Sequence, residues 1–185
     1  MTLREQLDEF YNQYDIPAEG GVNDKTFVVS LPLFSLTLPN FPWRKRMLYV
    51  HDLEHILNNQ DTSWKGEIFI ASWEISTGFL KNFPILIFPL WTMGWGLWVH
   101  PQTVVRAFRK GHSDRGIARL AIEKEILLEY DLSVLRQLTL NKRPERSSFF
   151  FYLKLAGWSF ISQLVFFSPL ITLIGFLSIF LKFLA

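Results

Sequence analysis

The 185-residue chain contains no cysteine. This absence excludes disulfide bonds, thiolate metal ligands and cysteine nucleophiles. Histidine is scarce too, with four residues in all, and this number excludes the membrane desaturases and hydroxylases that are built on several histidine boxes. The sequence also lacks a glycine-rich phosphate loop and a Gly-x-Ser-x-Gly elbow. The usual signatures of nucleotide-binding proteins and serine hydrolases are therefore missing.

Charged side chains are absent from a long C-terminal stretch. Leu155–Leu181 is a run of 27 residues without a charge, and about 20 apolar residues are enough to cross the hydrocarbon core of a bilayer. Pro169 divides the run, so both one kinked helix and a tight helical hairpin are compatible with it. We therefore predict a C-terminal membrane segment over residues 149–185, which follows a helical domain over residues 1–148.

A second uncharged stretch, Phe83–Val99, is only 17 residues long and contains two prolines and two glycines. It is short for a membrane span. Basic residues flank it on both sides, and a full crossing would place one basic set on the outer side, against the positive-inside tendency. We therefore expect a re-entrant or interfacial segment within the N-terminal domain.

The net charge of +2 is too small to indicate nucleic-acid binding. Arginine and lysine clusters lie beside the apolar segments, where anionic lipid head groups are the expected partners. The first fifteen residues are too charged for a secretory signal, so we expect the polar part of the protein to lie on the cytoplasmic side of a membrane.

Periodicity in the remaining sequence predicts a mainly α-helical fold, a helical bundle with a small N-terminal β ribbon. Thr2 and Glu5 have the spacing of a capping box at the start of the first helix. Pro32 separates the two alternating runs of the ribbon. The predicted elements are helices over residues 2–14, 43–57, 64–77 and 115–137, strands over 27–31 and 34–38, and a basic linker over 141–148.

The residues with the clearest chemical meaning are His51, Asp52 and His55, followed by Glu67. On an α-helix, residues four apart lie about 40° around the axis and about 6 Å along it, so the two imidazoles can converge on one ion. Glu67 could complete such a site from the next helix. Asp52 lies about 100° around the helix from His51 and could either bind the metal from the side or orient an imidazole.

Nitrogen and oxygen ligands of this kind suit zinc, iron or manganese, and their spacing does not name the metal. Two more specific metal-binding motifs do not match this sequence. The zincin motif requires glutamate directly after the first histidine, where Asp52 stands, and a soluble di-iron bundle requires a second copy of a unit like Asp52-x-x-His55. Both histidines could also be satisfied core residues. Glu74, seven residues after Glu67, is expected to be an exposed carboxylate or an acid that supports a ligand.

The motif reads His51-Asp52-Leu53-Glu54-His55 and, eleven residues later, ends at Glu67 in the setting Asp61-Thr62-Ser63-Trp64-Lys65-Gly66-Glu67. This pattern resembles the motif of the fourth Coq protein family of ubiquinone biosynthesis. A weaker resemblance to the later helices of that family is found in Ala107–Gly111 and Leu135–Leu138. The resemblance covers roughly residues 45–140.

The resemblance implies a mainly helical protein that holds a divalent metal, often zinc, through His51, Asp52, His55 and Glu67, with iron as the other candidate. It also implies binding of a prenylated quinone precursor at a membrane. Such a protein would either act at the C1 position of the precursor ring, as a decarboxylase or hydroxylase, or serve as a non-catalytic scaffold for other quinone-biosynthesis enzymes. The hydrophobic C-terminus departs from the peripheral members of that family.

Overall fold

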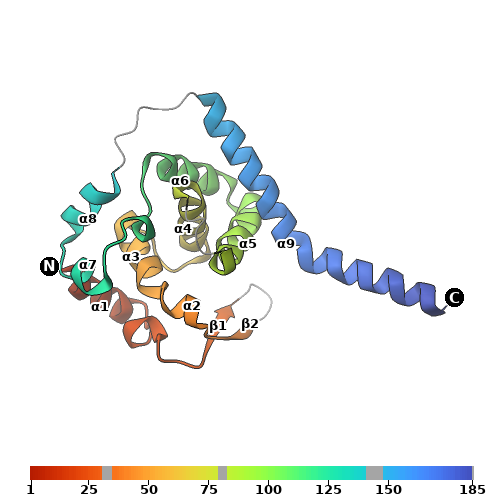
Figure 1. Ribbon diagram of the computed structural model, residues 1–185, viewed down its shortest axis with the longest axis horizontal. Helices are drawn as coiled ribbons and strands as arrows, with labels where there is room; N and C mark the ends of the chain where they lie inside the picture. The colour runs from red at the N-terminus through yellow and green to blue at the C-terminus, as the bar shows by residue number, and fades with distance from the viewer. Residues whose placement is uncertain (31–34, 79–82, 141–147, 185) are drawn as a thin grey trace.

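The computed structural model describes residues 1–30, 35–78, 83–140 and 148–184. It confirms a mainly helical fold with a two-stranded ribbon near the N-terminus and a long apolar helix at the C-terminus. Figure 1 shows α9 passing along one side of the body and projecting away from it. The elements are α1 (Leu3–Gln13), η1 (Ala18–Gly21), β1 (Thr26–Ser30), β2 (Ser35–Pro39), α2 (Pro42–Lys45), α3 (Leu48–Asn58), α4 (Trp64–Thr77), α5 (Phe83–Val99), α6 (Pro101–Ser113), η2 (Ile117–Arg119), α7 (Lys124–Leu128), α8 (Leu132–Thr139) and α9 (Ser148–Leu184).

The N-terminal helix and the ribbon form where the sequence predicts them. Thr2 caps α1 through the expected box, because its hydroxyl accepts from the Glu5 backbone N–H and its own N–H donates to the Glu5 carboxylate. Strands β1 and β2 pair antiparallel, from Thr26 opposite Pro39 to Ser30 opposite Ser35. Pro32 and the adjoining ends of the predicted strands lie outside the described residues.

The prediction of a single helix over 43–57 is wrong, because the structure has two helices there, α2 and α3. The chain leaves regular helical geometry at Met47, which has φ −108° and ψ −8°. The short α2 stays with the ribbon, where the Arg44 guanidinium lies 3.7 Å from the centre of the Phe27 ring and donates to Asn40 Oδ1 at 2.9 Å. Only α3 carries the two histidines of the motif.

The long helix predicted over 115–137 is also wrong. The structure has η2, α7 and α8 there, because Ala121 adopts a left-handed conformation with φ 55° and Asp131 begins a new helix by accepting from the N–H groups of Ser133 and Val134. Helix α6 is absent from the predicted elements, although Pro101 occupies a favourable position in its first turn. Residues 141–147 of the predicted linker lie outside the described residues.

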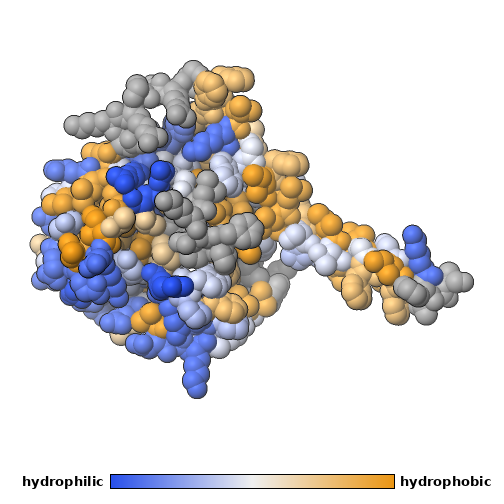
Figure 2. All heavy atoms as spheres, viewed as in Figure 1, coloured by the Kyte–Doolittle hydropathy of each residue, from blue (hydrophilic) through white to orange (hydrophobic). Residues whose placement is uncertain are grey.

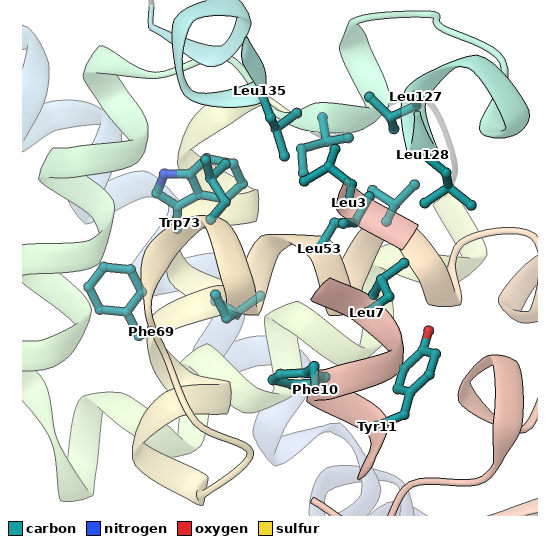
Figure 3. Packing of buried hydrophobic residues seen from close by; sticks show 14 of the residues in the cluster. Leu3, Leu7, Phe10, Tyr11, Leu53, Phe69, Trp73, Leu127, Leu128 and Leu135 are labelled. Carbon is teal, nitrogen blue, oxygen red and sulfur yellow. The ribbon is translucent and has the colours of Figure 1, made fainter. Parts of the chain in front are cut away.

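The main apolar core joins α1 to α3 and α4. Figure 3 shows Leu3, Leu7 and Phe10 of α1 beside Leu53 of α3 and Trp73 of α4. Trp73 and Leu53 are completely buried. This packing fixes α3 against α4, and these two helices carry all the predicted metal ligands.

A second apolar cluster joins α4, α5 and α6 to the first part of α9, through residues such as Ile68, Met93, Phe108 and Phe151. Helix α5 is continuous from Phe83 to Val99, and a re-entrant or interfacial position for it in a membrane stays a prediction. Of the two alternatives for the C-terminus, the structure has the single helix, with Pro169 inside it. Phe149–Lys182 is long and apolar enough to cross a membrane.

Candidate metal centre

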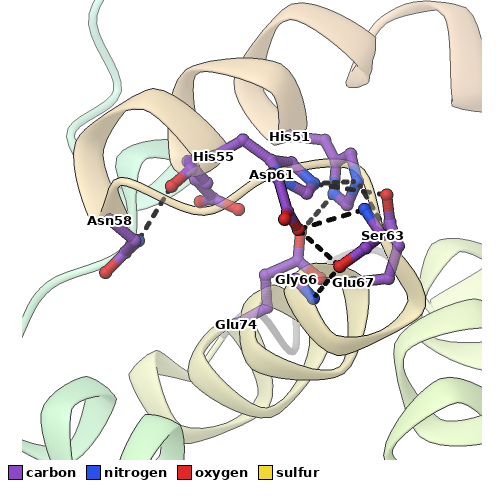
Figure 4. Close-up of polar contacts among 9 residues, drawn as sticks. His51, His55, Asn58, Asp61, Ser63, Gly66, Glu67 and Glu74 are labelled. Atoms are coloured by element: carbon purple, nitrogen blue, oxygen red, sulfur yellow. Dashed lines mark hydrogen bonds and ion pairs between the residues drawn. The ribbon is translucent and has the colours of Figure 1, made fainter. Parts of the chain in front are cut away.

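His51 and His55 of α3 converge with Glu67 of α4 (Figure 4). The Nε2 atoms of the two histidines are 3.3 Å apart. Glu67 Oε2 lies 3.4 Å from His51 Nε2, and Glu67 Oε1 lies 3.4 Å from His55 Nε2. All three residues offer one ligand atom within 4.8 Å of the others, so the group could hold a metal ion. Three of the four predicted ligands are therefore together.

The loop before α4 places Glu67 opposite the histidines. The Ser63 hydroxyl accepts from the Gly66 N–H and so caps α4, while Asp61 Oδ1 accepts from the Ser63 backbone N–H at 3.1 Å. The loop folds so closely over the first turn that a Cβ atom at Gly66 would overlap the backbone oxygen of Asp61. The Gly-Glu pair of the motif thus has a local structural cause, since glycine permits the turn that carries the carboxylate.

Asp52, the fourth predicted ligand, lies beside the cluster and not in it. Its Oδ2 accepts a hydrogen bond from the Tyr11 hydroxyl at 2.9 Å, and it joins neither group of candidate ligands found among the described residues. Burial raises the pKa of Asp52, against the opposing effects of His51 and of the Tyr11 hydrogen bond. A ligand role for Asp52 stays a prediction.

Glu74 supports His51 from the side opposite Glu67. Its Oε1 lies 3.1 Å from His51 Nδ1, and its side chain is only 5% exposed. The expectation of an exposed carboxylate is therefore wrong, because α4 buries this face against α3. The other expectation, an acid that supports a ligand, matches this position. A histidine that binds a metal through Nε2 usually donates its Nδ1–H to such a group.

Glu54 is a further buried acid at the centre, and it was not among the predicted site residues. It is completely buried, and neither of its carboxyl oxygens has a hydrogen-bond partner in the described part of the chain. Burial and the neighbouring carboxylate of Glu74 raise the pKa of Glu54 well above its usual range. Its spacing of three residues from His51, which places both on neighbouring positions of the helix surface, could have indicated it.

The charges at the centre favour a cation between His51, His55 and Glu67. Burial alone would raise the pKa of Glu67, but hydrogen bonds and charge interactions with the two histidines hold it well below its usual range. For His51 the balance is reversed, since burial lowers its pKa while Glu67 and Glu74 raise it well above the usual value. These interactions favour the ionised form of Glu67, and a positive charge beside it is stabilised.

The candidate metal centre lies in the wall of a cavity of about 660 Å³ between β1, α2, α3, α4 and α5. Asp52 and Arg44 also line it. Burial lowers the pKa of the Arg44 guanidinium, and the charge of Asp52 opposes this effect. The other walls are largely apolar and include Phe27, Val29, Trp43, Leu48, Phe88 and Pro89. The volume is within the range of small-molecule sites.

The chain matches no family model, no curated protein and no solved structure. The chemistry of the site therefore follows from its own geometry. His51 and Glu67 are each about one-third exposed at the site, whereas the His55 side chain is 1% exposed. A metal held here would be reached from the cavity, past His51 and Glu67.

Proposed function

We propose that this chain is a membrane-attached, metal-binding protein of ubiquinone or isoprenoid-quinone biosynthesis that binds a prenylated precursor beside its metal. The convergence of His51, His55 and Glu67 on the wall of a largely apolar cavity carries the proposal. The resemblance of the motif to the fourth Coq protein family supports the choice of pathway, and the apolar helix α9 supports attachment to a membrane. The metal ligands and the cavity bring a polar and an apolar binding surface together, as an amphiphilic precursor requires.

Zinc is the metal that we propose, with iron as the second candidate. In a tetrahedral zinc site with bonds of about 2.0–2.1 Å, neighbouring ligand atoms lie about 3.3–3.4 Å apart. The separations of 3.3 and 3.4 Å between the ligand atoms match this geometry. Octahedral sites with bonds of about 2.0–2.1 Å bring adjacent ligands closer, to about 2.9 Å.

Three protein ligands leave a coordination position open toward the cavity, which is the pattern of catalytic zinc sites. When bound, the metal would supply a Lewis acid for an oxygen on the precursor ring. His51, His55 and Glu67 would hold the metal, and Glu74 would keep the His51 ring oriented. Phe27, Trp43 and Phe88 would form an apolar wall along the prenyl chain. The reaction that we favour is one at the C1 position of that ring.

The second candidate function is a non-catalytic scaffold that binds a prenyl lipid and organises partner enzymes at the membrane. In this case the residues of the motif would only join α3 to α4. The observation that favours it is the large exposed apolar surface of α9, which includes Leu173, Phe176 and Leu177. Such a surface could hold the protein at the membrane without any chemistry in the cavity.

Native mass spectrometry of the protein purified from its own membranes tests the proposal. We expect one metal ion and one prenyl lipid bound to each chain. A strain that lacks the protein should lose quinone and accumulate a prenylated precursor. Metal-free chains that still carry prenyl lipid would favour the scaffold, and chains that carry neither metal nor lipid would contradict both functions.

Replacing the carboxyl group of Glu74 should weaken metal binding. We expect Glu74→Gln to lower zinc affinity by roughly 10–100-fold, the usual effect of losing a carboxylate that orients a ligand histidine. Zinc titration of the purified full-length protein in detergent measures this affinity. Glu129→Gln is the matched control, because Glu129 is an exposed acid outside the candidate metal centre, so the zinc affinity of this variant should stay close to that of the unsubstituted protein. Equal affinity in the Glu74 variant would contradict the supporting role.

A further inference from the structure

Helix α9 has two parts with different surroundings. In the first part, Phe151 belongs to the core, Lys154 Nζ donates to Ser76 O at 2.7 Å, and Gln163 Nε2 donates to Gly94 O at 2.9 Å. From Ser168 to Lys182 every side chain is exposed. Figure 1 shows this second part projecting from the body, and Figure 2 shows it largely covered by hydrophobic residues on the face in view. We call residues 168–184 the free part of α9.

The free part of α9 has the chemistry of a helix that lies in lipid. Its three hydroxyl groups all donate to backbone oxygens of the same helix, from Ser168 to Val165, from Thr172 to Ser168 and from Ser178 to Ile174, each at 2.8 Å. Polar groups in a bilayer must find their partners within the protein in this way. Lys182 is the only charged residue of the free part, and it lies near the end, where its chain can reach the head groups.

The length of the free part also suits a bilayer. Its 17 residues span about 25 Å at a rise of about 1.5 Å per residue. The hydrocarbon core of a bilayer is about 30 Å thick, and small mismatches are absorbed by local thinning and by flanking side chains. The whole of α9, at 37 residues, is about 55 Å long and far exceeds one bilayer core.

Aromatic side chains gather where the free part begins. The rings of Trp91 and Trp95 lie 5.4 and 6.1 Å from that of Phe166, and the ring of Trp98 lies 6.2 Å from that of Phe167. Trp98 is 65% exposed, and its indole N–H donates to Gln163 at 2.9 Å. We call Trp91, Trp95, Trp98, Phe166 and Phe167 the aromatic band. Tryptophan concentrates at membrane surfaces, because its ring is apolar and its N–H is polar.

We propose that the bilayer surface lies at the aromatic band, so that only the free part of α9 enters the hydrocarbon core and the folded body rests against the membrane. This inference goes beyond the proposed function and does not depend on the metal. It places the cavity close to the membrane surface, because Trp64 lines the cavity and its ring lies 6.5 Å from that of Trp91 in the band.

The absence of cysteine allows a direct test, since one introduced cysteine can carry a single spin label. Four exposed residues are suitable, and their substitutions are Ile126→Cys, Phe160→Cys, Leu173→Cys and Leu177→Cys. Each full-length variant is placed in phosphatidylcholine vesicles with a fraction of anionic lipid. Electron paramagnetic resonance then measures collisions with oxygen, which dissolves in lipid, and with a nickel chelate, which stays in water.

We expect labels at 173 and 177 to lose contact with the nickel chelate and to gain contact with oxygen, with 177 the deeper of the two. Labels at 126 and 160 should keep their contact with nickel. A label at 160 as deep as the one at 177 would overturn the proposal, because the whole of α9 would then lie in lipid. A label at 177 as accessible to nickel as the one at 126 would also overturn it, because the free part would then be outside the bilayer.

Discussion

His55→Ala should abolish stoichiometric metal binding. His55 supplies one of the three converging ligand atoms, and its side chain is 1% exposed. Without it, His51 and Glu67 would be the remaining members of this ligand group, and two protein ligands do not make a stable zinc site. We expect a larger loss of affinity than the roughly 10–100-fold caused by removing a supporting acid. Elemental analysis of the purified full-length protein measures the metal bound to each chain.

Two further variants separate a loss of the ligand from a loss of the fold. His100→Ala removes a histidine outside the candidate metal centre, so its metal content should match that of the unsubstituted protein. Glu67→Gln keeps the size of the side chain at a site that is about one-third exposed, so the protein should fold normally and still bind zinc weakly. Unchanged metal content in the His55 variant would contradict the metal centre, and both histidines would then be core residues.

The part of the centre on α3 could be predicted because it depends on local geometry alone. The spacing of His51 and His55 fixes both rings on one face of any helix that contains them. The position of Glu67 also has a local origin, because Ser63 caps the start of α4 and serine is a favoured N-cap residue. Spacing, a capping residue and a short loop therefore set the positions of these residues within each helix, and the packing of α3 against α4 brings them together.

Glu74 and Glu54 could not be placed in the same way, because their burial depends on how α3 packs against α4. Every residue of α4 from Ile68 to Thr77 is buried, so this part of the helix has no exposed polar face that would show which side contacts α3. A pattern of hydrophobic residues identifies a buried face only when another face is exposed. The burial of Glu74 was therefore hard to predict from the sequence of α4 alone.

The two incorrect helix predictions, over 43–57 and 115–137, have a related cause. The break at Met47 and the left-handed turn at Ala121 occur without glycine or proline at the position itself, so no residue of the usual kind marks them. The sequence did not decide between one kinked helix and a helical hairpin for α9. Proline breaks helices in water but is accepted in helices whose surroundings satisfy the backbone.

Gly66→Ala should destabilise the protein and disturb the candidate metal centre together. An added Cβ would overlap the backbone oxygen of Asp61 and lie 2.6 Å from Asp61 Oδ1. Neither atom can move freely, since Asp61 also accepts from Ser63, which caps α4. Relief requires the loop to leave the first turn of α4. We expect a loss of roughly 1–3 kcal/mol in the free energy of unfolding, typical of overpacking, and weaker zinc binding because Glu67 is the next residue.

The direction of this change in stability identifies its cause. Alanine usually stabilises a helix relative to glycine, by about 0.5–1 kcal/mol, so a destabilising Gly66→Ala can only reflect the close approach of the loop. Gly157→Ala is the matched control, because Gly157 is helical and a Cβ there would meet no atom within 4 Å. Thermal unfolding in one detergent, followed by zinc titration, compares the two variants. Equal stability and equal zinc affinity in both would show that the loop does not hold Glu67 in place.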